Sequence, residues 1–217
     1  MTEAYWLTCV DPGELLRSAR RKKKLLTDRK FRLFAVACAR SVRPLLASDN
    51  GRRAVEVAER YADGSATTHE MSVAQLDAIR DSAEAEDLGG ASEYKANQAL
   101  FAAINACDDR NRFAYAAECA VDAAPDPQLE RAQQCALLRD ILGNPFRPIT
   151  FSPAWRSSTV LALAAQMYDS RDFGAMPILA DALQEAGCDS ADVLNHCRAP
   201  GVHVRGCWVV DLVLGKE

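Results

Sequence analysis

Aromatic residues are scarce in this chain, at 7% of its 217 residues. Long apolar runs are absent too, and none approaches the ~20 consecutive apolar residues that a membrane-spanning helix requires. The chain opens on Met1-Thr2-Glu3-Ala4, which is acidic and precedes no apolar segment typical of a secretory signal. We therefore expect neither a membrane span nor secretion.

The fingerprints of common enzyme classes are also missing. The sequence contains no phosphate-binding loop, dinucleotide-binding glycine pattern, nucleophile elbow or HExxH zinc motif. Its net charge of −4 lacks the broad positive potential on which nucleic-acid binding depends. These absences disfavour nucleic-acid binding and leave no enzyme class indicated.

Cysteine, in contrast, is plentiful. Eight cysteines without a secretory signal are typical of a protein that keeps free thiols in the reducing cytoplasm, so we predict a cytoplasmic protein without disulfides. Five of them lie among alanines and leucines, where free cysteine acts as a small buried apolar residue. These are Cys9, Cys38, Cys107, Cys119 and Cys135.

Helical periodicity dominates between the glycine and proline breaks. Abundant alanine favours helices over sheets. Apolar residues recur in steps of three and four, as at Phe31, Phe34, Cys38 and Val42, whereas strand-like alternation persists nowhere. We predict an all-α fold, a compact multi-helix bundle of about eight to ten helices with no extended sheet. The tail from Cys207 to Leu214 is also predicted to be helical, because it has no partner strand.

Three prolines fall within residues 143–153 and forbid a regular helix there. We therefore predict an N-terminal helical half (1–142), a packed proline-rich connection (143–153) and a C-terminal helical half (154–217), together forming one compact unit. The connection and the start of the second half carry large apolar residues that we expect to be buried: Phe146, Ile149, Phe151 and Trp155.

The C-terminal block concentrates the reactive side chains. Three cysteines and two histidines fall within the twenty residues that end at Cys207. The candidate metal ligands are Cys188, Cys197, His203 and Cys207. His196 is left out because it adjoins Cys197, and neighbours on a helix point about 100° apart.

The candidate catalytic residues come from the same block. His203 and Cys207 lie four residues apart, and Asp211 follows after four more. A helix that began as early as His203 would carry all three on one face, although Gly201 and Gly206 indicate a later start. A thiol nucleophile, an imidazole base and an orienting carboxylate form a recognised catalytic combination. The spacing matches no established ligand pattern, however, so we expect no cofactor, with zinc as the alternative.

A basic stretch lies near the N-terminus. Residues 17–32 contain nine of the 26 lysines and arginines. A solvated helix end and loop is the simpler interpretation. The alternative is a docking patch for an acidic partner, a nucleic acid or a membrane surface. The candidate partner-binding residues are Arg20, Arg21, Lys22, Lys23 and Lys24.

Several blocks suggest a family. They are MTEAxWLxCxDP at the start, DRKxRLFAVACxR at 28–40, RRAVEVAERYADG at 52–64, LLRDIxGNPFRP at 137–148, and the C-terminal block. Together they resemble a paralogue-rich family of small bacterial proteins of unassigned function, which implies one compact unit but no activity. The phrase PILADALxExG is also similar to segments found beside bacterial leucine-rich repeats, which implies a role in protein interaction.

These observations favour a soluble helical module that binds another protein. The alternative is a metal- or thiol-dependent enzyme that uses His203, Cys207 and Asp211. The acidic net charge and the lack of enzyme motifs favour the first hypothesis.

Overall fold

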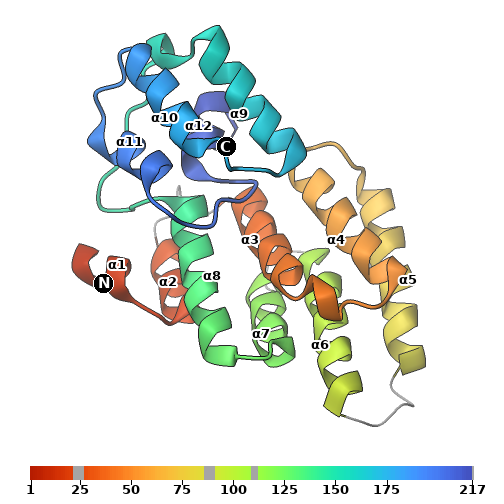
Figure 1. Ribbon diagram of the computed structural model, residues 1–217. Helices are drawn as coiled ribbons and strands as arrows, with labels where there is room; N and C mark the ends of the chain where they lie inside the picture. The colour runs from red at the N-terminus through yellow and green to blue at the C-terminus, as the bar shows by residue number, and fades with distance from the viewer. Residues whose placement is uncertain (22–26, 86–90, 109–111, 217) are drawn as a thin grey trace. The chain divides into compact units, whose positions relative to one another are not determined.

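The computed structural model describes residues 1–21, 27–85, 91–108 and 112–216. Within these ranges all regular structure is helical, with twelve α-helices, two 3₁₀ helices and no strand (Figure 1). The all-α class is therefore confirmed. The twelve α-helices exceed the predicted eight to ten because the N-terminal segment forms two short helices.

The chain divides into two compact units, Met1–Leu138 and Arg139–Glu217. The proline-rich residues 143–153 thus belong to the second unit. The first unit contains α1 (Glu3–Thr8), α2 (Pro12–Arg20), α3 (Asp28–Ser41), η1 (Arg43–Leu45), α4 (Asp49–Ala62), α5 (Thr68–Ala85), α6 (Ala91–Ala106), α7 (Phe113–Ala123) and most of α8 (Pro127–Leu142). The second contains the last turn of α8, then η2 (Pro153–Trp155), α9 (Ser158–Ser170), α10 (Met176–Glu185), α11 (Ala191–Arg198) and α12 (Trp208–Leu214).

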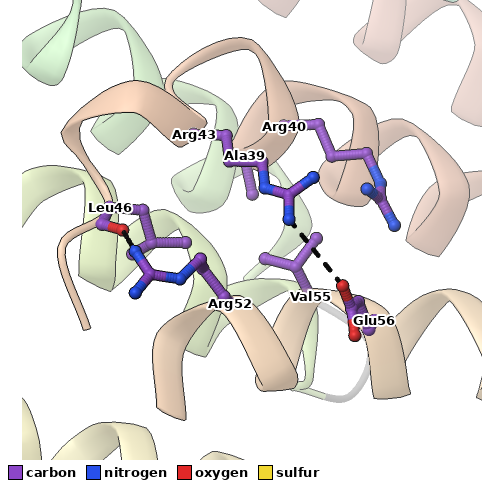
Figure 2. A pocket seen from close by; sticks show the side chains of 7 residues that line it. All are labelled: Ala39, Arg40, Arg43, Leu46, Arg52, Val55 and Glu56. Atoms are coloured by element: carbon purple, nitrogen blue, oxygen red, sulfur yellow. Dashed lines mark hydrogen bonds and ion pairs between the residues drawn. The ribbon is translucent and has the colours of Figure 1, made fainter. Parts of the chain in front are cut away.

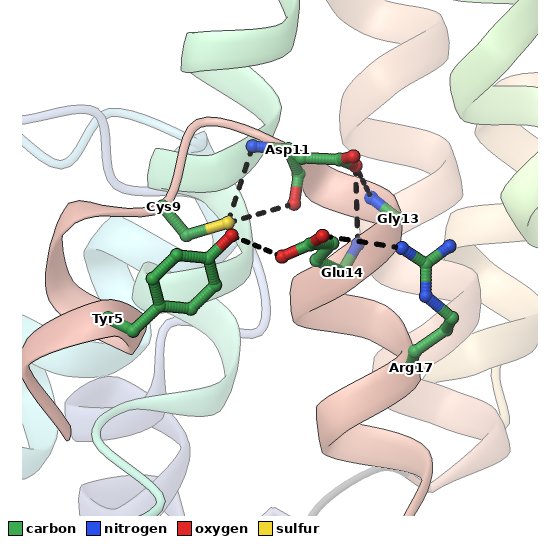
Figure 3. Close-up of polar contacts among 6 residues, drawn as sticks. All are labelled: Tyr5, Cys9, Asp11, Gly13, Glu14 and Arg17. Atoms are coloured by element: carbon green, nitrogen blue, oxygen red, sulfur yellow. Dashed lines mark hydrogen bonds and ion pairs between the residues drawn. The ribbon is translucent and has the colours of Figure 1, made fainter. Parts of the chain in front are cut away.

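Helices α1 and α2 were not predicted from the sequence, and a side chain caps each of them at its N-terminus. The Asp11 carboxylate accepts hydrogen bonds from the backbone N–H groups of Gly13 and Glu14, at the N-terminus of α2 (Figure 3). The Tyr5 hydroxyl donates to the Glu14 carboxylate and links the two helices.

Helix α3 is the centre of the first unit and packs against α4, α6 and α7. Its buried residues include Arg32, whose guanidinium donates to the carbonyl oxygens of Ala106 and Asp108 and lies over the rings of Tyr61 and Phe113. A buried charge needs such partners. Arg32 therefore acts as a structural residue that fastens α3 to the end of α6.

The second unit has its own core of sixteen buried residues, drawn from α9–α12 and the segments between them. Helix α10 packs against α9 and α11, and α12 packs against the same two helices. Ile149, Phe151 and Trp155 pack against this core but are only half-buried, and Phe146 is half-buried as well. The proline-rich segment thus covers the core and does not enter it.

Helix α12 confirms the prediction that the tail is helical. Val209 and Val213 are fully buried, whereas Trp208 and Leu212 are half-buried. Arg156 donates from Nε to the carbonyl oxygen of Val213 and from Nη2 to that of Leu212, so it satisfies carbonyls left open at the end of the helix.

Gly143 ends α8 in the left-handed conformation, with φ of +67°, and a Cβ atom there would lie 3.2 Å from the Trp208 ring. We expect Gly143→Ala to lower the unfolding free energy by about 2–4 kcal/mol, because the left-handed backbone and the crowding each contribute. Gly187→Ala is the matched control, since Gly187 has φ of +86° but open space around it. Denaturant unfolding should show a loss of only about 1–2 kcal/mol for the control. Equal losses would show that Trp208 moves aside freely.

Among the described residues, no helix is both long and apolar enough to cross a membrane.

Candidate metal centre

Four side chains of the second unit converge on one point: Asp140, His196, His203 and Cys207. Each offers one oxygen, nitrogen or sulfur atom, and these four atoms all lie within 4.8 Å of one another. They come from four places in the chain. Asp140 lies in the last turn of α8, His196 in α11, His203 in the segment 199–207, and Cys207 directly precedes α12.

The distances approach those of a tetrahedral zinc site. Asp140 Oδ1 lies 2.6 Å from His203 Nδ1 and 3.2 Å from His196 Nε2. Cys207 Sγ lies 3.3 Å from His196 Nε2 and 3.9 Å from His203 Nδ1. Zinc bonds of about 2.0–2.3 Å give a tetrahedron with edges of roughly 3.3–3.6 Å. Small side-chain shifts would therefore place all four atoms around one ion.

The surroundings hold these side chains in place. The second carboxylate oxygen of Asp140, Oδ2, accepts the backbone N–H of Val204 at 3.0 Å, which leaves Oδ1 turned toward the two imidazoles. The His196 ring contacts the His203 ring edge-on, with centroids 4.9 Å apart, and lies 5.0 Å from the Trp208 ring. Such outer contacts fix the orientation of a ligand before it meets a metal.

The centre is largely closed to solvent. Cys207 is fully buried, and the exposed fractions of the Asp140, His203 and His196 side chains are 3%, 9% and 20%. His196 thus forms the one solvent-facing edge among the four. Nε2 of His203 is buried and has no hydrogen-bond partner among the described residues.

Burial also sets the protonation of the acidic groups. Burial and then the charge of Asp140 raise the pKa of the Cys207 thiol well above its ordinary range. Burial alone would also raise the pKa of Asp140, but the hydrogen bonds and charges of His196 and His203 outweigh it and leave that pKa below its ordinary value. Without a metal the centre therefore holds a carboxylate and a neutral thiol, and a bound cation would favour the thiolate.

Of the predicted site residues, His203 and Cys207 meet in this centre and the others lie elsewhere. Cys188 and Cys197 are buried in the core of the second unit, and burial raises the pKa of Cys197 to about 12. Asp211 is buried on α12 and is not one of the four converging residues.

The sequence interpretation missed Asp140 and His196. Asp140 lies 63 residues before His203, and no motif links the two. His196 and Cys197 do point in different directions, as expected for neighbours on a helix, since Cys197 enters the core. The histidine, and not the cysteine, faces the centre. The same geometric rule could have indicated His196. Because neighbouring residues on a helix point about 100° apart, His196 can face the centre while Cys197 faces the core.

The basic stretch is only partly described. Arg20 and Arg21 are exposed at the end of α2, and the Arg20 guanidinium lies over the Phe31 ring at 5.1 Å. Lys22, Lys23 and Lys24 lie outside the described residues.

A small pocket in the first unit brings together Arg40, Arg43 and Arg52 (Figure 2). Each guanidinium already contacts a carboxylate: Arg40 that of Glu59, Arg43 that of Glu56 and Arg52 that of Asp49. The positive charge is thus largely compensated, and the pocket does not form an anion site of its own.

No disulfide joins any of the eight cysteines, and all eight are buried. We expect Ellman's reagent to find eight thiols after denaturation without reductant, and to react slowly with the folded protein because burial keeps the thiols from solvent. Freshly purified material with six or fewer titratable thiols would contradict this prediction.

No protein-family model, no curated protein and no solved structure matches this chain. The resemblance to a bacterial family therefore stays a prediction, and the centre has to be interpreted from its own chemistry.

Proposed function

We propose that this protein is a helical module whose C-terminal unit binds one zinc ion through Asp140, His196, His203 and Cys207. The observation that carries the proposal is the convergence of four different donor atoms within 4.8 Å of one another. The earlier expectation of no cofactor rested on sequence spacing alone. The tertiary arrangement favours the zinc alternative instead.

The donor set suits zinc better than the other common divalent ions. Zinc accepts imidazole nitrogen, thiolate sulfur and carboxylate oxygen in a tetrahedral arrangement. Calcium and magnesium prefer oxygen ligands and higher coordination numbers. A thiolate and two imidazoles beside one carboxylate therefore point away from both.

The number of ligands favours a role in binding or organisation over catalysis. Catalytic zinc usually has three protein ligands and an open position for water or substrate, whereas four protein ligands close the site. The alternative of a thiol-dependent enzyme has less support, since Cys207 is fully buried and its thiol pKa is raised. We therefore keep the proposal that the module acts by binding another protein, with zinc organising its C-terminal unit.

Elemental analysis of protein purified without chelators tests the zinc site. We expect close to one zinc per chain in the wild type and little in His203→Ala or Cys207→Ser. Cobalt substitution should add the visible bands of a tetrahedral site and an ultraviolet thiolate band that Cys207→Ser removes.

Two variants serve as matched controls. His69→Ala removes the third histidine, which is exposed on α5, and Cys197→Ala removes a buried thiol that adjoins His196 but is not one of the four donors. Both should retain zinc. If the wild type, reconstituted with excess zinc and freed of unbound ions, holds none while its helical spectrum is native, the proposal is wrong.

A further inference from the structure

We infer that this zinc site is reversible and acts as a switch, in which zinc availability controls how firmly the segment 199–207 is held. The inference rests on the proposed zinc site and adds its regulation. The inferred ion exchanges with zinc in solution and so responds to zinc supply, and it is not a permanent part of the fold.

The ligand set itself limits the affinity. Only one of the four ligands, Cys207, is a thiolate, the soft donor that selects zinc over hard cations. A metal-bound histidine normally donates its other ring N–H to an acceptor, and loss of that partner weakens binding about 10–100-fold. Zinc on His203 Nδ1 would place the ring proton on Nε2, which has no acceptor among the described residues.

The solvent-facing edge makes exchange possible. With 20% of its side chain exposed, His196 is the most accessible of the four ligands. An incoming chelator can displace this imidazole first, so zinc does not have to wait for the unit to unfold.

The second unit does not depend on the ion for its core. It comprises Arg139–Glu217 and has sixteen core residues, of which only Cys207 is a proposed ligand. Metals or disulfides become necessary for folding mainly below about 40 residues, where too little surface can be buried. We therefore expect loss of zinc to loosen one segment and to leave the helices folded.

The segment 199–207 is the part that the ion would control. It carries two of the four ligands, His203 and Cys207, while the other two sit on α8 and α11. Its first part, Ala199–Val202, is exposed to solvent. Arg205 is held separately by the carbonyl oxygens of Tyr168 and Asp169. Zinc would therefore add a restraint on both sides of Arg205, at His203 and at Cys207. The exposed stretch that precedes His203 offers Val202 to a partner.

Trp208 provides a built-in reporter, because its ring lies 5.0 Å from the His196 ring. Zinc should be added to chelated full-length protein in a chelator-buffered titration that follows tryptophan emission. We expect a saturable change with a Kd on the order of 10⁻⁸ to 10⁻⁷ M, the weak end of the range for structural zinc peptides. Trp208→Phe should lose the emission change, whereas Trp155→Phe, which leaves the contact between Trp208 and His196 in place, should keep it.

Hydrogen exchange separates a switch from mere binding. We expect zinc to slow exchange of the Val204 amide, which hydrogen-bonds Asp140, at least tenfold, while amides in α9 and α10 change little. Chelator should reverse the effect within minutes and leave the far-ultraviolet helical signal unchanged.

The possible failures are distinguishable. If no zinc binds at saturation, the proposed function itself fails. If zinc binds but leaves only when the second unit unfolds, the ion is structural and the switch is wrong while the zinc site stands. Reversible binding without altered exchange in 199–207 would likewise overturn the switch alone.

Discussion

Removal of residues 208–217 is expected to unfold the C-terminal unit. The deletion removes α12, whose Val209, Val210 and Val213 are fully buried. Burial of a side chain of this size contributes about 1.5–3 kcal/mol, and a whole domain has only about 5–15 kcal/mol of net stability. Three such losses, together with the cavity that they leave, exceed what a unit of this size can tolerate.

The matched control is removal of residues 216–217 alone. Lys216 is half-buried and places its ammonium group 4.5 Å from the centre of the buried Tyr168 ring, a contact worth about 0.5–2 kcal/mol. Near-ultraviolet circular dichroism and methyl NMR should show a native second unit in this control and a disordered one in the longer deletion. Native methyl signals from Leu179 and Val193 after the longer deletion would contradict the prediction.

Replacement of Asp140 by asparagine should have the second largest effect. In the chelated protein we expect a loss of roughly 2–3 kcal/mol of unfolding free energy at neutral pH. The carboxylate lies close enough to hydrogen-bond His196 and His203 and accepts the Val204 N–H, and hydrogen bonds to a charged group contribute about 1.5–3 kcal/mol. Asp169→Asn is the control, because Asp169 is exposed in the same unit and the Arg205 bond engages its carbonyl oxygen only.

The effect should depend on pH with a definite sign. Burial raises the pKa of Asp140, but His196 and His203 lower it by more. The pKa of Asp140 therefore lies below its ordinary value of 3.8. A carboxyl whose folded pKa is depressed adds stability above its unfolded pKa and loses it as the pH falls through the folded one. In denaturant unfolding from pH 7 to pH 3, the difference between wild type and Asp140→Asn should therefore begin to narrow below about pH 4. A difference that grows in acid would contradict the assignment.

The helices follow from local features of the sequence. Thr27 caps α3 and Ser157 caps α9 through hydrogen bonds to backbone N–H groups three residues on, and Gly143 ends α8. Capping and periodicity involve residues within a few positions of one another, so one sequence is enough to predict them. We did not predict α1 and α2 from the sequence, although their caps at Thr2 and Asp11 are equally local.

Only the tertiary structure determined which residues form the metal centre. His203 and Cys207 are four residues apart, so their pairing could be predicted from the sequence. The addition of Asp211 to this pair required one continuous helix from His203 onward. The helix begins only at Trp208, because the chain turns at Gly206 with φ of +94°, and His203 is therefore directed by its contact with Asp140. That contact spans 63 residues and depends on how α8, α11 and the segment 199–207 pack, which hydrophobic burial determines without leaving a local pattern.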